Sequence, residues 1–265
     1  MTSSILGIAA IAAYLIGWVC YQTQLRSDPL HNTKTVQIIA ALAVAMHGAA
    51  MVSLLFVDGG LDLSLLKILP LLALAINVLV WISGLKKPLH SLYLFLFPIS
   101  ALSLLGALLS TSTKPALVMS TNLQAHVLIS ILAYSLLAIA ALQALLVGYQ
   151  NWQLKHKHQN LLMRAFPALQ TMEVLLFELI WAGQILLSLS LLSGFLFYDD
   201  FFAQKLVHKV VFSLLAWVVY AILLWGRHYR GWRGNKAIRW TWGGFIAILL
   251  GFIGSKVVLE FILNS

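Results

Sequence analysis

The sequence carries very little charge for its length. Lysine, arginine, aspartate and glutamate together make up 9% of the 265 residues, whereas 61% are hydrophobic. A soluble domain has about a quarter of its residues charged. So few charges do not cover a water-facing surface, and the composition therefore excludes an ordinary soluble domain. We predict an all-α, polytopic integral membrane protein built as a helical bundle, because lipid offers no partner for unpaired backbone groups.

Cysteine is also scarce, because Cys20 is the only one in the chain. A single cysteine excludes an intrachain disulfide, a CxxC redox motif and a thiolate zinc site. The sequence also shows no general acid–base pair, nucleophile triad or phosphate-binding loop, so no catalytic residue and no stand-alone enzyme is predicted. The net charge of +9 does not indicate a nucleic-acid partner, because the basic residues fall in short loops between apolar runs.

Long apolar runs fill most of the chain. A helix needs roughly 20 apolar residues to cross the hydrocarbon core of a bilayer. We therefore predict about eight transmembrane helices in a single transmembrane domain that covers residues 1–265. The predicted spans are residues 5–21, 36–56, 65–83, 92–109, 123–148, 174–197, 206–225 and 238–263.

The loops between these runs differ in charge. Most of the 17 lysine and arginine residues fall in the first, third, fifth and seventh loops. Basic loops stay on the cytoplasmic side, so we expect both termini on the outer, periplasmic side. The fifth loop is the longest. Its residues 161–172 fit a short helix on the membrane surface and an ordinary connecting loop equally well.

Three of the eight histidines fall inside predicted spans. His47 lies in the middle of the second span, and His126 and His208 lie about one turn into the fifth and seventh spans, near the outer face. Ionisable residues at membrane depth cost a few kcal/mol and usually face the protein interior. Imidazole is an iron ligand and can hold haem axially. The alternatives are a structural hydrogen bond for His47 and a simple interfacial position for His208.

Other polar residues support a different class of function. Glu178 and Gln184 are predicted to be buried in the sixth span. Together with His47 they fit a small-solute transporter or channel with polar groups at the membrane midplane. Transporters often contain inverted repeats, and we find no internal repeat in the sequence. A third interpretation is a scaffold subunit that binds no cofactor.

Two stretches of the chain match a known pattern. The first begins His126-Val-Leu-Ile-Ser-Ile-Leu-Ala-Tyr134, and the second begins Pro167-Ala-Leu-Gln-Thr-Met-Glu173 and continues through Gly183, Gly194 and Trp217 to Arg230-Gly-Trp-Arg-Gly234. Together they resemble the CcsA/CcmC/CcmF family of haem-handling membrane proteins used in cytochrome c assembly. Residues 64–263 resemble the cytochrome c assembly domain. The length, the span count and the N-terminal half are closest to the YpjD-type (HemX-like) subgroup.

The resemblance implies a multi-pass protein of the bacterial inner membrane that binds, moves or presents haem for cytochrome maturation. The cofactor would be reversibly bound haem b, with no other metal, and other cytochrome assembly proteins would be partners. In the family, a histidine that opens the helix matching the fifth span ligates haem. That role falls on His126. His47 matches a histidine of the subgroup in the second span, and the choice of His47 or His208 as the second ligand is our own hypothesis.

One feature of the larger family is missing. Its members have a tryptophan-rich outer segment that ends in Trp-x-Trp-Asp and cradles haem for attachment. The equivalent loop, residues 197–208, contains no tryptophan, although it keeps the aromatic residues Tyr198, Phe201 and Phe202. A complete haem-lyase role is therefore not expected from this sequence.

Overall fold

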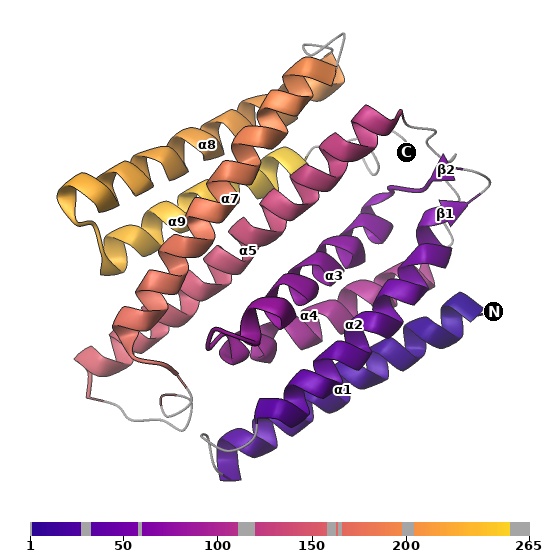
Figure 1. Ribbon diagram of the computed structural model, residues 1–265, viewed down its shortest axis with the longest axis horizontal. Helices are drawn as coiled ribbons and strands as arrows, with labels where there is room; N and C mark the ends of the chain where they lie inside the picture. The colour runs from indigo at the N-terminus through magenta and orange to yellow at the C-terminus, as the bar shows by residue number, and fades with distance from the viewer. Residues whose placement is uncertain are drawn as a thin grey trace. The chain divides into compact units, whose positions relative to one another are not determined.

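The computed structural model describes residues 2–27, 33–57, 60–110, 120–157, 163, 166–197 and 204–254. Nearly all of these residues are helical (Figure 1), so the predicted all-α class is confirmed. The helices belong to two compact units. Unit 1 comprises Met1–Met119 and Gln159–Pro167, and unit 2 comprises Ser120–His158 and Ala168–Ser265.

Unit 1 contains four long helices. Helix α1 packs against α2 and α4, and α3 packs against α2 and α4. A two-residue antiparallel pairing of β1 and β2 connects α2 to α3, and the short helix η1 precedes α4. The elements are α1 (Thr2–Ser27), α2 (Thr33–Leu55), β1 (Phe56–Val57), β2 (Gly60–Leu61), α3 (Leu65–Gly84), η1 (His90–Leu92) and α4 (Tyr93–Leu109).

A proline inside α4 is accommodated by a side chain from α1. Pro98 lies within α4, and a proline in a helix leaves the carbonyl four residues earlier without its backbone donor. That carbonyl belongs to Leu94, and the indole Nε1 of Trp18 donates to it at 3.0 Å. The backbone group that Pro98 frees is therefore satisfied by a neighbouring helix, as membrane helices require.

Unit 2 contains the helices that carry the family-like motifs. Helix α5 packs along α7 and α9, and α8 packs against α9 and α7. Figure 1 shows α5 and α7 side by side, and α8 and α9 joined by a tight turn. The elements are α5 (Thr121–Lys155), α7 (Leu169–Phe197), α8 (Gln204–Arg230), α9 (Gly234–Leu249) and the π-helical η2 (Leu250–Gly254).

Helices α5 and α7 approach each other closely at Gly183. A Cβ atom at this glycine would lie 2.6 Å from Cδ2 of Leu137, which is fully buried on α5. Small residues at such positions allow helix backbones to approach closely in membranes. The core of unit 2 continues around this contact, with Leu176, Ile180 and Tyr220 buried.

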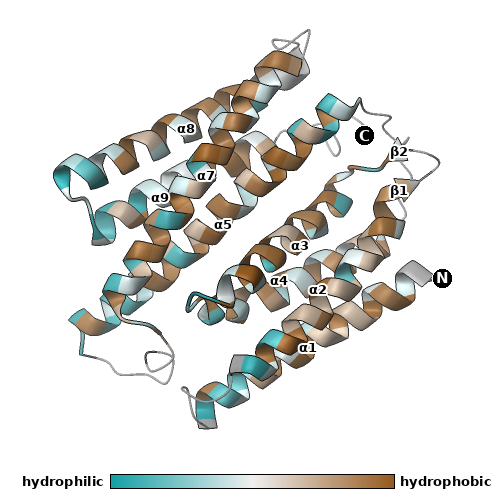
Figure 2. Ribbon diagram, in the orientation of Figure 1, coloured by the Kyte–Doolittle hydropathy of each residue, from teal (hydrophilic) through white to brown (hydrophobic). Residues whose placement is uncertain are grey.

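The surfaces of the helices are apolar as well as their interiors. Large side chains such as Leu102 (68% exposed) and Phe195 (65% exposed) face outward. Within the described residues, seven helices are long and apolar enough to cross a membrane. In Figure 2 the hydrophilic residues gather mostly at helix ends and in connecting segments. Such exposed apolar surfaces suit lipid rather than water, so the predicted membrane bundle is confirmed.

Each predicted span overlaps a described helix, but several helices extend beyond the predicted bounds, among them α1 to Ser27 and α8 to Arg230. Helix α5 extends to Lys155, seven residues beyond the predicted end, and α7 begins at Leu169, five residues earlier than predicted. The eighth predicted span corresponds to α9 and η2, and its residues 255–263 lie outside the described residues.

Three other predictions concern the loops and the organisation of the chain. Within the proposed surface helix 161–172, residues 169–172 belong to α7, whereas 161, 162, 164 and 165 lie outside the described residues. The outer location of both termini stays a prediction. The single transmembrane domain over residues 1–265 also stays a prediction.

Candidate functional site

His126 lies near the start of α5, in unit 2. Ser120 precedes the helix, and its Oγ accepts from the backbone N–H of Leu123 at 3.4 Å, which caps the first turn. The His126 side chain is half-buried. Its Nδ1 lies 2.9 Å from Oγ of Ser193 on α7, which joins two residues that are 67 positions apart.

Two further serines complete a small polar cluster with His126 and Ser193. Ser193 Oγ donates to the carbonyl of Ser190 at 2.9 Å. Ser130 Oγ donates to the carbonyl of His126 at 2.7 Å, and the hydroxyls of Ser130 and Ser190 lie 2.7 Å apart. Two of these contacts, His126–Ser193 and Ser130–Ser190, cross the interface between α5 and α7, which favours a fixed position for the imidazole.

The contacts of Ser193 are compatible with a tautomer of His126 that suits metal binding. A serine hydroxyl has one hydrogen. When Ser193 donates it to the Ser190 carbonyl, it accepts from His126 Nδ1, and in that tautomer the neutral ring has its lone pair on Nε2. A histidine that binds a metal through Nε2 ordinarily donates its Nδ1–H to a neighbouring acceptor in this way.

More polar contacts connect α5 and α7 to α8 in the same unit. The hydroxyls of Tyr134 and Ser213 lie 3.2 Å apart. The indole Nε1 of Trp217 donates to Ser188 Oγ at 2.8 Å, and Gln184 Nε2 donates to the carbonyl of Trp217 at 3.2 Å. Such bonds between membrane helices each contribute about 1 kcal/mol and hold α7 and α8 in register beside the His126 cluster.

The serine partners were not identified from the sequence, although part of the signal is present there. His126, Ser130 and Tyr134 are spaced four residues apart, which places them on one face of a helix. Ser190 and Ser193 share a face of α7 in the same way. The spacing predicts two polar stripes, but it does not show that the stripes meet.

The other predicted haem ligands are placed differently by the structure. His208 lies in α8 of unit 2, and its side chain lies outside the described residues. His47 lies in α2 of unit 1 and is fully buried. Its Nδ1 is 3.0 Å from the hydroxyl of Tyr14, whereas its Nε2 is buried with no hydrogen-bond partner within the described part of the chain.

The two polar residues of α7 in the transporter interpretation differ in burial. Gln184 is buried as predicted, but Glu178 is exposed, so the prediction that it is buried is wrong. Glu178 lies on the face of α7 opposite to the buried neighbours Leu176 and Ile180, because a helix turns by about 100° per residue. Among the described residues, no three His, Cys, Asp or Glu side chains come together as a metal-binding group.

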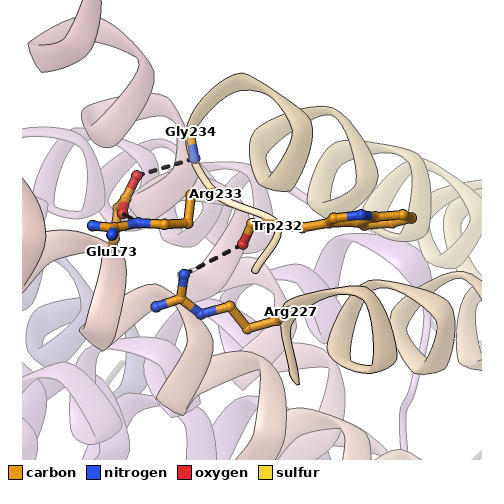
Figure 3. Close-up of polar contacts among 5 residues, drawn as sticks. All are labelled: Glu173, Arg227, Trp232, Arg233 and Gly234. Carbon is orange, nitrogen blue, oxygen red and sulfur yellow. Dashed lines mark hydrogen bonds and ion pairs between the residues drawn. The ribbon is translucent and has the colours of Figure 1, made fainter. Parts of the chain in front are cut away.

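The two ends of the second family-like motif meet in an ion pair (Figure 3). Glu173 is 6% exposed and lies near the start of α7. Its Oε2 accepts from Nε of Arg233 at 2.9 Å, and its Oε1 accepts from the backbone N–H of Gly234 at 3.0 Å. The carboxylate therefore neutralises the arginine and also occupies the N-terminus of α9, where negative charge is favoured.

Comparisons with known proteins identify the family that the two sequence motifs resemble. A family model described as "Cytochrome C assembly protein" matches residues 35–263. The inner membrane protein YpjD of Escherichia coli (strain K12) is 30% identical over 233 residues, which cover 85% of this chain and 86% of YpjD. The cytochrome c biogenesis protein CcsA of Prochlorococcus marinus (strain NATL1A) is 31% identical over 95 residues, or 35% of this chain and 30% of CcsA. No solved structure matches the chain.

Proposed function

Because this chain belongs to the cytochrome c assembly protein family and is a multi-pass protein of the bacterial inner membrane, we propose that it binds haem through His126. The bound haem would be handled for cytochrome maturation, in contact with other cytochrome assembly proteins. The protein would hold and release haem b rather than attach it covalently. When bound, haem supplies an iron that accepts imidazole nitrogen as an axial ligand.

The observation that carries this proposal is the hydrogen bond between His126 Nδ1 and Ser193 Oγ. With His126 Nδ1 donating to Ser193, the ring is oriented and its lone pair lies on Nε2, the nitrogen that would bind iron in this proposal. The donor set fits haem, because an imidazole nitrogen is a recurrent axial ligand of haem iron. The Ser130–Ser190 contact holds α5 against α7 four residues after His126.

A second axial ligand is proposed to be His47 or His208. His47 has a buried Nε2 without a partner in the described part of unit 1, and a buried polar atom of this kind requires an explanation such as a ligand. Tyr14 would orient His47 through Nδ1 as Ser193 orients His126. For His208 the proposal rests on its position in α8, in the same unit as His126.

The proposal is tested by absorption spectroscopy of the full chain, purified in detergent after expression with added haem. Wild-type protein is expected to show a Soret band that shifts on reduction. The band should be weakened strongly in His126→Ala, and should be affected in only one of His47→Ala and His208→Ala. The proposal would be contradicted if the folded wild-type protein held no stoichiometric amount of haem under these conditions.

His228→Ala is the matched control for these variants. His228 lies at the other end of α8, at an exposed position, and the spectrum should be unchanged when it is replaced. A loss of the Soret band in this variant as large as in His126→Ala would show that the band reports general damage or adventitious haem rather than the His126 site.

A further inference from the structure

Basic residues are concentrated in the turn between α8 and α9 and in the adjoining ends of the two helices. They are Arg227, Arg230, Arg233, Lys236 and Arg239, which we call the α8–α9 basic cluster. In the described part of unit 2 the only acidic residues are Glu173 and Glu178. Glu173 is already engaged by Arg233 and the backbone of Gly234. The cluster therefore keeps an excess of positive charge that the described acidic residues of unit 2 do not balance.

The turn is held in one conformation by several contacts. Gly231 and Gly234 have φ values of 62° and 56°, which favour glycine. The backbone N–H of Trp232 donates to the carbonyl of Gly226 at 3.1 Å, and Arg227 Nη1 donates to the carbonyl of Trp232 at 3.4 Å (Figure 3). A rigid arrangement of cations lowers the entropy cost of binding an anion.

Two of the cations in the cluster lie over the rings of tryptophan side chains. The guanidinium of Arg230 lies 5.0 Å from the ring centroid of Trp225, and Nζ of Lys236 lies 3.9 Å from that of Trp232. Trp225 and Tyr229 are exposed. Tryptophan and tyrosine gather at the level of the lipid headgroups, where an apolar ring meets a polar surface.

We propose that the α8–α9 basic cluster binds the phosphate group of an anionic phospholipid. Arg230, Lys236 and Arg239 are all exposed; Lys236 and Arg239 lie three residues apart on α9 and therefore share a face. The exposed rings of Trp225 and Tyr229 would lie against the glycerol and the upper acyl chains. Charge complementarity and the aromatic residues favour a lipid over a free anion, because a free anion gains nothing from the rings. This inference does not depend on haem.

The test uses purified full-length protein in neutral detergent, titrated at low salt with fluorescent cardiolipin or fluorescent phosphatidylcholine. Cardiolipin should bind at least tenfold more tightly than phosphatidylcholine. Each basic residue near a membrane surface contributes about fivefold. The triple variant Arg230→Gln/Lys236→Gln/Arg239→Gln should therefore lose roughly a hundredfold in affinity for cardiolipin, whereas Arg230→Lys/Arg239→Lys keeps the charge and should stay within about threefold of wild type.

The control replaces two lysines of a basic turn in unit 1. Lys86→Gln/Lys87→Gln removes exposed charge after α3, and should change the affinity less than twofold. The proposal is overturned if this control falls as far as the triple variant, if the triple variant binds normally, or if the two lipids bind equally well. It is also overturned if millimolar inorganic phosphate displaces all of the cardiolipin, since that result would indicate a site for a free anion.

Discussion

Glu173 and Arg233, 60 residues apart in the sequence, form an ion pair between the first turns of α7 and the residue that precedes α9. The side chain of Glu173 is 8% exposed, whereas that of Arg233 is 53% exposed. One partner is thus desolvated, and its charge is balanced by a residue that remains in contact with solvent or headgroups. The pair joins the two ends of the second family-like motif.

Glu173→Gln should destabilise the protein by about 1–2 kcal/mol. The variant keeps the shape of the side chain but loses the charge that accepts from Arg233 and Gly234, and hydrogen bonds to charged groups contribute about 1.5–3 kcal/mol. The exposure of Arg233 reduces this value. The measurement is denaturant unfolding in mixed micelles. Glu178→Gln, an exposed position on the same helix, should change the free energy of unfolding by less than about 0.5 kcal/mol, and equal effects would contradict this account.

Gly183→Ala should also destabilise the protein, by about 1–3 kcal/mol through overpacking. Its new methyl group would lie against the fully buried Leu137 on α5, and one of the two helices would have to move. Gly106→Ala on α4 is the control, since its methyl group would meet Leu66 at 3.8 Å, an ordinary contact. Thermal unfolding of both variants in one detergent checks this. The reverse order of stability would show that α5 and α7 do not meet at Gly183.

The sequence predicted the helices well because hydropathy depends only on local composition. It missed the extension of α5 to Lys155, since Gln150 and Gln153 end the apolar run although both side chains are buried. The prediction that Glu178 is buried was wrong for a related reason. A polar residue in a span can face either way, and the choice depends on which neighbours pack around the helix. His126 was recognised from its motif, whereas Ser193 required the pairing of α5 with α7.

The acid stability of unit 1 should depend on Asp62, which precedes α3 and is 2% exposed. Burial raises the pKa of its carboxyl, but hydrogen bonds from Lys67 Nζ at 2.6 Å and the backbone N–H of Ser64 at 2.9 Å outweigh burial, so the pKa lies below its usual value. The folded pKa is therefore lower than the unfolded pKa of about 4. The ion pair stabilises the fold above that pH, and its contribution is lost as the pH falls through the folded pKa.

Asp62→Asn tests this linkage. The free energy of unfolding of the wild type should fall more steeply than that of the variant as the pH drops from about 5 to about 3, around the unfolded pKa. The measurement is a series of unfolding titrations across this range. Parallel curves for the two proteins would show that the Asp62 carboxyl has the same pKa in both states.

Ser193→Ala should weaken haem binding about 10- to 100-fold, the usual effect of removing the partner of a metal-binding histidine. The ring of His126 would lose the acceptor that orients it. Ser188→Ala on the same helix is the control, because Ser188 contacts Trp217 rather than His126. Haem titration followed by the Soret band gives both affinities. Equal losses would indicate that α7 is disturbed in general, and no loss in Ser193→Ala would remove the role of the serine.

The most direct test of haem ligation by His126 is chemical rescue. His126→Gly leaves a space for a free imidazole at the position of the removed ring. The variant should purify with little Soret absorbance, and adding millimolar imidazole should restore the wild-type spectrum in its oxidised and reduced forms. A wild-type spectrum in His126→Gly without imidazole, or a spectrum that imidazole does not restore in the folded variant, would contradict the assignment of His126 as the ligand.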